Sequence, residues 1–169
     1  MTMTRLLKYP LISLMFFSFI APVQASDDET LMVSTKRMSV SAAIKMAQGA
    51  MAECTKQGIQ IGVTVVDREG IVQVTLRDTI AAQITVPISK AKAFTSANFN
   101  SATSAMSDRA NTPVGRAPGI LMSAGGLPIQ VGGALIGAIG VSGAPSGVTD
   151  EQCAQAGIDA MMDDLEMSL

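Results

Sequence analysis

The sequence predicts an α/β domain with a mainly antiparallel sheet of five strands and helices on both faces of that sheet. Two apolar segments meet at Gly132-Gly133, and two β-branched segments flank a turn at Asp67–Gly70. A tight two-residue turn joins antiparallel strands, and glycine suits it because both positions need positive φ. Apolar residues at helical spacing flank these hairpins, and such helices must cover the apolar faces of the sheet.

The strand after the glycine turn, Leu135–Ser142, has one nearly flat face. Along the strand, residues of this face, among them the small Ala138 and Gly140, alternate with residues of the opposite face. Glycine inside a strand often marks a close approach by another group. Either a helix or a ligand is therefore expected to pack closely against this face.

The first half of the domain is expected to run helix, strand, strand, helix. Ser39 is a typical N-cap residue, and Gly58 a typical C-terminal stop. The apolar stripe predicted for this first helix consists of Val40, Ile44, Ala47, Met51 and Cys54. The β-branched run Ile59–Val66 and the return strand Ile71–Leu76 form the first predicted hairpin.

A second helix is predicted over residues 84–98, with Ile84, Ile88, Ala91 and Thr95 on one face. Pro87 is tolerated only in a first turn, so the regular helix should begin near Val86. The segment 98–119 is rich in Ser, Asn, Thr, Pro and Gly and is interpreted as loop with short helical turns. Ile120–Met122 is predicted to be the fifth strand.

The last helix is predicted to start at a capping box in which Thr149 caps and Gln152 reaches back. Its apolar stripe includes Cys153. If the first and last helices share a face of the sheet, Cys54 and Cys153 come near each other. A single cysteine pair in an exported protein suggests a disulfide, and two buried free thiols are the alternative.

The N-terminal residues resemble a targeting segment. Arg5 and Lys8 precede the short apolar run 11–21, and Val23-Gln24-Ala25 is a small-x-small cleavage site. We therefore expect a signal peptide over residues 1–25, a flexible leader over 26–37 and a single domain over 38–169. The alternative is a membrane anchor, but the apolar run 11–21 is shorter than the about 20 residues that a spanning helix needs. The mature protein is expected in the periplasm or outside the cell, with no membrane span.

Composition excludes several classes of site. The chain has 0 His, which rules out a Ser-His-Asp triad, a histidine-bearing zinc site and histidine-ligated haem. Its net charge is −2 and no Lys/Arg-rich run is present, so no nucleic-acid partner is expected. No catalytic residue stands out, and the sequence favours a binding protein over an enzyme.

Five short motifs resemble the GlcG/HbpS-like family, which is described as haem-binding or haem-degrading. They are Val65-Val66-Asp67 with Gly70, Lys92-Ala93-Phe94-Thr95, Pro118-Gly119, Gly125-Gly126-Leu127-Pro128-Ile129, and the stretch from Gly137 to Gly143. The resemblance implies a profilin-like sandwich, a homo-oligomer and, for some relatives, haem as a bound small molecule.

Several residues are candidates for a ligand site, and for Lys92 and Thr95 the family resemblance is the main reason. Lys92 and Thr95 would line a pocket over the sheet, with Lys92 pairing to a propionate. The backbone N–H groups at Gly125 and Gly126 would cradle an anionic group. Met122, like Met106, would offer a sulfur ligand to iron, and Arg116, like Arg109, would clamp a carboxylate.

Each of these residues also has a plain structural interpretation: a solvated lysine, a glycine turn, a core methionine or a surface arginine. The function expected from the sequence is that of an exported, oligomeric haem-binding protein. The alternative is a protein that binds a small non-haem organic acid, or an accessory or assembly protein without catalytic activity.

Overall fold

The structure is a computed structural model that describes residues 31–169. The predicted signal peptide, residues 1–25, lies outside the described residues. Thr35–Leu169 forms one compact unit that contains all of the described helices and strands. Within residues 31–169, no helix is long and apolar enough to cross a membrane.

The sheet has four strands in the order β2-β1-β4-β3, and every neighbouring pair is antiparallel. Their bounds are Gly62–Asp67 (β1), Val72–Arg77 (β2), Gly126–Val131 (β3) and Ala134–Ser142 (β4). The α/β class and the antiparallel sheet are confirmed, but the prediction of five strands is wrong. The expected strand Ile120–Met122 is not formed, because the Leu121 N–H donates to the Thr95 hydroxyl, 2.8 Å away, and not to another strand.

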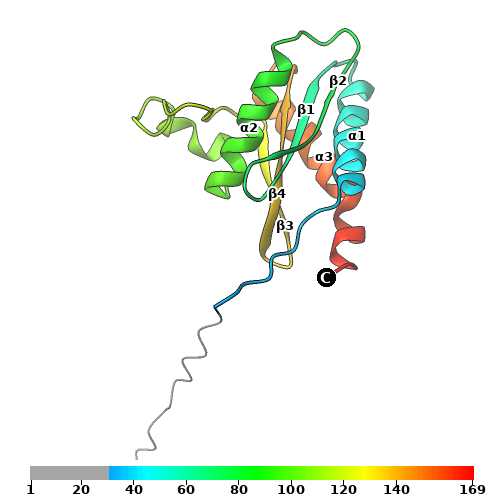
Figure 1. Ribbon diagram of the computed structural model, residues 1–169. Coiled ribbons are helices and arrows are strands. Elements are labelled where there is room, and N and C mark those ends of the chain that lie inside the picture. Colours follow the sequence, from blue (N-terminus) through cyan, green and yellow to red (C-terminus); the bar gives the residue numbers. More distant parts are fainter. Residues whose placement is uncertain (1–30) are drawn as a thin grey trace, which may run out of the picture. The chain divides into compact units, whose positions relative to one another are not determined.

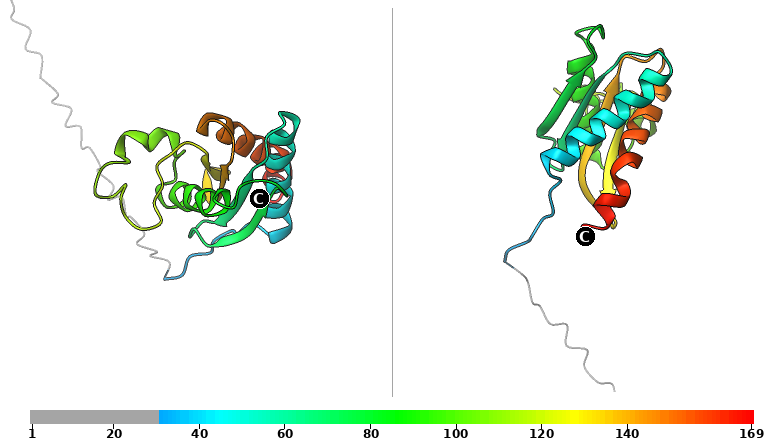
Figure 2. Two further views of the ribbon diagram at one scale, coloured as in Figure 1. Left: turned by 90° about the horizontal axis from the view of Figure 1, so that it is seen from above. Right: turned by 90° about the vertical axis from the view of Figure 1, so that its right-hand side faces the viewer.

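Helices cover both faces of the sheet, as predicted (Figures 1 and 2). Helices α1 (Val40–Lys56) and α3 (Gly147–Glu166) lie side by side on one face, and α2 (Thr85–Phe99) lies on the other. The short 3-10 helix η1 (Ser104–Arg109) follows α2. It belongs to a segment, residues 102–120, that projects beside α2 in Figure 1 and that we call the arm.

The two predicted hairpins are confirmed. Gly132 and Gly133, between β3 and β4, have φ values of 57° and 79°. These are the left-handed conformations that a two-residue hairpin turn needs. Between β1 and β2, Asp67 Oδ1 accepts from the N–H groups of Glu69 and Ile71 at 3.0 and 2.9 Å. Asp67 therefore stabilises its own turn.

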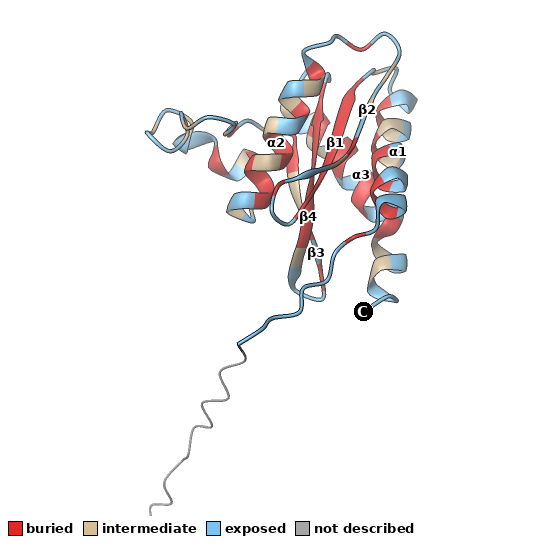
Figure 3. Ribbon diagram, in the orientation of Figure 1, coloured by how far each residue is buried: buried red, intermediate tan, exposed pale blue. Residues whose placement is uncertain are grey.

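The core between α1, α3 and the sheet differs from the predicted helix stripe (Figure 3). Val40 is 56% exposed, and α1 instead buries a face built mainly of alanine. The reason is the close approach of the two helices: a Cβ on Gly157 of α3 would lie 2.5 Å from the Met46 carbonyl oxygen of α1. Small residues are the ones that fit at such a crossing.

Helix α3 starts earlier than the predicted capping box. Ser146 is the N-cap residue, and its Oγ accepts from the Thr149 N–H at 3.2 Å. The serine takes the capping position because Gly147 and Val148 already belong to the first helical turn. Asp150 lies in this turn, where the helix dipole favours a negative charge.

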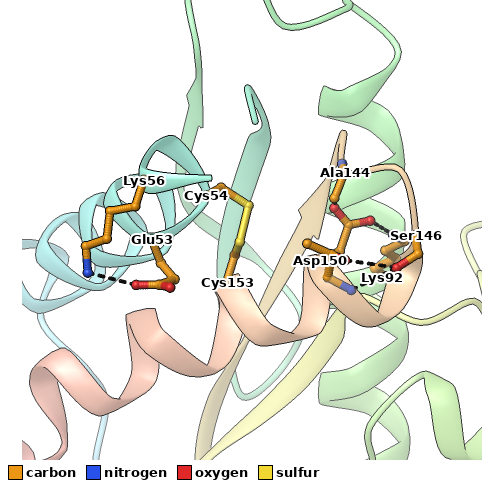
Figure 4. Close-up of a disulfide and its surroundings, with 9 residues drawn as sticks. Glu53, Cys54, Lys56, Lys92, Ala144, Ser146, Asp150 and Cys153 are labelled. Carbon is orange, nitrogen blue, oxygen red and sulfur yellow. Dashed lines mark hydrogen bonds and ion pairs between the residues drawn. A yellow bond between two sulfur atoms is a disulfide. The ribbon is translucent and has the colours of Figure 1, made fainter. Parts of the chain in front are cut away.

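A disulfide joins α1 to α3. The Sγ atoms of Cys54 and Cys153 are 2.07 Å apart, and both residues are fully buried (Figure 4). The two cysteines are separated by 99 positions in the sequence. The bond therefore closes a loop that contains every strand of the sheet and helix α2.

Helix α2 occupies nearly the predicted range, but of the four residues expected on one of its faces the structure fully buries Thr95 alone. Ile84, just before the helix, is 60% exposed, whereas Ser89, Lys92 and Ala93 are buried. The sheet leaves little room: a Cβ on Gly140 would lie 2.1 Å from the Ser89 carbonyl oxygen. Small side chains permit this approach, and their hydroxyls find partners within the protein.

Candidate functional site

The flat face of β4 receives helix α2. A Cβ on Gly140 would lie close to two backbone atoms of this helix: the Ser89 carbonyl oxygen, as described above, and the backbone nitrogen of Ala93, 2.6 Å away. The Ser89 hydroxyl shares a hydrogen bond of 2.9 Å with the buried hydroxyl of Thr64 on β1. Of the two occupants that the sequence allowed for this face, the structure places a helix there and leaves no space for a ligand.

Lys92 lies inside this interface (Figure 4). It is 4% exposed, and its Nζ donates to Asp150 Oδ2 at 2.8 Å and to the Val141 carbonyl at 2.9 Å. Asp150 is 3% exposed, and its Oδ1 accepts from the Ala144 N–H at 3.0 Å. The ammonium that was expected to meet a propionate thus joins α2 to the start of α3 and to the end of β4.

Burial raises the pKa of Asp150 from its ordinary value of 3.8. Loss of hydration disfavours the charged carboxylate. The hydrogen bonds from Lys92 and from the Ala144 N–H act in the opposite direction and only partly offset this cost. The pair is therefore buried and hydrogen-bonded, yet its carboxylate remains less readily ionised than a free one.

The backbone donors at Gly125 and Gly126 also have partners within the protein. The Gly125 N–H donates to Glu151 Oε1 at 3.2 Å, and the Gly126 N–H donates to the Thr103 hydroxyl at 2.9 Å. A Cβ on Gly125 would lie 2.5 Å from Lys92 Nζ. The glycine pair therefore makes room for the buried lysine, and its N–H groups do not face an open cradle.

The other three predicted residues are dispersed. Thr95 is fully buried on α2, and Met122 is buried just beyond the arm. Arg116 is exposed on the arm itself. The structure thus gathers Lys92 with the glycine pair and separates them from the remaining candidates. None of the six residues lines either of the two hollows described next.

The first hollow lies between the outer face of α2 and the end of the arm. It has a volume of about 290 Å³ and is lined by Pro87, Lys90, Ala91, Phe94, Pro118 and Gly119. The four α2 residues follow helical spacing on one side of the helix. The position of a Cβ on Gly119 is 3.7 Å from the Phe94 ring, so the arm stands directly against this aromatic side chain. We call this space the outer hollow.

The outer hollow is almost entirely apolar. Lys90 is the one charged residue in its lining, and it is exposed. An apolar surface with one aromatic ring and one ammonium group suits a flat apolar molecule that carries a carboxylate. A signal for this site was present in the sequence, since Phe94 and Pro118-Gly119 belong to motifs shared with the GlcG/HbpS-like family.

A second hollow of about 290 Å³ lies near the end of α3, and its lining includes Lys36, Arg37 and Leu169. Its cations already have partners: Lys36 donates to the Leu169 oxygen. Arg37 pairs with Asp67 and Glu69, each at 3.3 Å. This hollow therefore offers a ligand less free charge than the outer hollow does.

The described residues contain no metal-binding cluster. No group of three or more His, Cys, Asp or Glu side chains in residues 31–169 is arranged to hold a metal ion. The outer hollow includes neither an imidazole nor a thioether in its lining.

Comparison with known proteins identifies the relatives of this chain. The crystal structure of HbpS shares 37% sequence identity at a TM-score of 0.74, and the match covers 78% of this chain and 94% of that chain. A double mutant of Streptomyces reticuli HbpS shares 38% identity at a TM-score of 0.73, with coverage of 83% and 97%. The haem complex of PduOC, at 24% identity and a TM-score of 0.68, shares the fold over 74% of this chain and 95% of that chain.

A search of the curated proteins found no match. The family model described as "Haem degrading protein HbpS-like" matches residues 38–159, which include the sheet, α2 and both walls of the outer hollow. The chain is therefore a member of the HbpS-like family.

Proposed function

We propose that this protein binds haem in the outer hollow. The observation that carries the proposal is the apolar surface formed by Phe94, Pro87 and Pro118, with the Lys90 ammonium as its one charge. The family description and the haem complex of PduOC, a protein of the same fold, support haem as the ligand.

Haem is a flat apolar ring with two carboxylate groups, and the lining residues suit both parts. Phe94 and the prolines would contact the ring, and Lys90 would pair with one carboxylate. Arg116 lies on the same arm, two residues before Pro118, and is exposed. We assign it the second carboxylate. The volume of about 290 Å³ lies at the lower end for ligand sites, so the hollow would cover part of the ring.

A hemin titration of the mature protein, residues 26–169, tests this function. We expect a saturable shift of the Soret band at micromolar protein. Phe94→Ala should weaken binding about tenfold or more, because it removes the aromatic contact. Lys90→Gln should weaken hemin binding about threefold at low salt. The effect of this substitution should be smaller at high salt, because salt screens exposed charges.

The matched control is Lys45→Gln, which removes the same charge from an exposed position on α1, across the sheet from the hollow. It should bind hemin as the wild type does. Urea denaturation of each variant separates loss of binding from loss of folding. The absence of any saturable shift in the wild type would refute haem binding.

The lack of an iron ligand in the hollow favours a second candidate, a metal-free carboxylate ligand. The chain has 0 His, and Met122 is buried outside the hollow. If iron contributes no bond, metal-free protoporphyrin should bind with an affinity within a few-fold of that of hemin.

A small organic acid is the other metal-free ligand. Native mass spectrometry that found a stoichiometric ligand of another mass, together with no hemin binding, would favour it.

We also propose that the protein is exported, to the periplasm or out of the cell. The charged and apolar pattern of residues 1–25 supports this, as does the Cys54–Cys153 disulfide, since such bonds persist in oxidising compartments. Expression of the full chain, fractionation and mass spectrometry should give a mature N-terminus at Ser26. An intact N-terminus on cytoplasmic protein would refute export.

Finally, we propose that the protein acts as a homo-oligomer. Exposed isoleucines precede α2, with Ile80 76% and Ile84 60% accessible. Large apolar side chains that are exposed close together favour an interface between proteins. Light scattering on the mature protein should give a multiple of the chain mass, and a monomer mass at working concentrations would refute the proposal.

A further inference from the structure

We propose that Thr95 is a positioning residue of the outer hollow: its buried hydroxyl holds the Pro118–Gly119 wall against α2 without touching the ligand. The Thr95 Oγ1 accepts from the Leu121 N–H at 2.8 Å, and Thr95 is fully buried. Leu121 follows the wall by two residues. The part of this inference that concerns ligand binding rests on the proposed function of the hollow.

The bond to Thr95 has no substitute along this stretch. In the part of the chain that the structure describes, it is the one hydrogen bond that joins residues 117–124 to another element. The other bonds of this stretch stay local, such as Ile120 N–H to the Ala117 carbonyl at 3.1 Å. The wall therefore depends on one side-chain acceptor for its polar attachment.

The opposite end of the arm is fixed independently. The Ser96 hydroxyl donates to the Ser101 carbonyl at 2.8 Å, and Thr103 exchanges hydrogen bonds with Gly126 on β3. The Ser104 N–H also donates to Glu151 at 3.1 Å. Loss of the Thr95 bond should therefore loosen the wall and leave the beginning of the arm in place.

The arm has few buried side chains that would replace this attachment. Between residues 104 and 120, Met106 is the one buried residue, and it lies in η1. Met122, directly after Leu121, is itself buried. The expected result of losing the hydroxyl is a wall that opens more often while the domain stays folded.

Two substitutions at Thr95 separate the hydroxyl from its packing. Thr95→Val keeps the shape and removes the acceptor, whereas Thr95→Ser keeps the acceptor. Thr64→Val is the matched control: it also removes a fully buried hydroxyl beneath α2, one that bonds to Ser89 and Thr75. Thr64 makes no hydrogen bond to the arm.

The first measurement is hydrogen exchange of the Leu121 amide, which needs no ligand. Exchange should become about tenfold faster in Thr95→Val, because the amide loses its acceptor. Trypsin cleavage after the exposed Arg116 should accelerate in the same variant. The second measurement is hemin dissociation into excess apomyoglobin, which should also become about tenfold faster.

We expect Thr95→Ser to restore both rates and Thr64→Val to leave both unchanged. Unchanged Leu121 exchange in Thr95→Val would overturn the positioning role. Faster exchange with unchanged hemin dissociation would overturn the claim that the wall controls the ligand. If the wild type bound no hemin, the proposed function would fail, and faster Leu121 exchange would still support Thr95 as the residue that holds the wall.

Discussion

The buried pair of Lys92 and Asp150 provides the sharpest test of the site geometry. Lys92→Met keeps the length of the side chain, but it leaves the Asp150 carboxylate buried without a countercharge. Both residues are at most 4% exposed. Removing one partner of a buried ion pair costs about 3–5 kcal/mol, because the remaining charge is uncompensated. This is a large share of the roughly 5–15 kcal/mol that stabilises a domain.

The double variant Lys92→Met/Asp150→Asn should recover at least half of that loss, because no isolated charge then remains in the interior. Urea denaturation of the wild type, both single variants and the double variant gives the coupling free energy between the two residues. We expect a coupling of about 2 kcal/mol or more. A loss below about 1 kcal/mol for Lys92→Met would refute the reasoning, as would a double variant no more stable than Lys92→Met.

The same double variant tests which residues bind the ligand. Because Lys92 lines neither described hollow, the variant should bind hemin within about twofold of the wild type. A strong loss of hemin affinity in the folded double variant would place Lys92 back in the binding site.

Three further predictions concern stability. Reduction of the Cys54–Cys153 disulfide should lower the free energy of unfolding by up to about 4.7 kcal/mol, because the bond closes a loop with a sequence separation of 99; equal urea midpoints for oxidised and reduced protein would contradict this. The raised pKa of Asp150 means that the folded protein holds this proton more tightly than the unfolded chain does. Its contribution to stability is therefore greatest at low pH and decreases as the pH rises from about 3.8 through the folded-state pKa. Subtracting the pH profile of Asp150→Asn from that of the wild type should show this downward slope, and an upward slope would reverse the assignment. Gly140→Ala should cost about 1–3 kcal/mol in urea denaturation, since the new methyl group would meet the Ser89 carbonyl; a loss under about 0.5 kcal/mol would show that α2 shifts freely.

Local signals in the sequence predicted the hairpins and the helix ranges well. The glycine turn before Ala134, the Asp67 turn and the cap at Ser39 each depend on residues close in the chain. Errors arose where a distant partner decided the outcome. The expected strand at Ile120–Met122 failed because Thr95 on α2 supplies the acceptor for the Leu121 N–H.

The candidate site shows the same difference between local signals, which the sequence carries, and contacts between distant segments, which it does not. Lys92 was expected to pair with a ligand carboxylate or to be solvated, but its partner is Asp150, which lies 58 positions later, and no local pattern indicates that pairing. The outer hollow was missed because its two sides, α2 and Pro118-Gly119, are separated in the sequence by most of the arm. Its motifs were visible in the sequence, and their contact with each other was not.

The sequence by itself determined the α/β class, the antiparallel hairpins, the cysteine pair as a candidate disulfide and the absence of any histidine ligand. These follow from residue types and short-range periodicity, which express the backbone preferences of nearby residues. The tertiary structure alone decided that α2 covers the glycine face of β4, that Lys92 pairs with Asp150 and that an apolar hollow opens beside Phe94. Each of these depends on how closely two distant segments approach, and that distance is set by packing across the sheet.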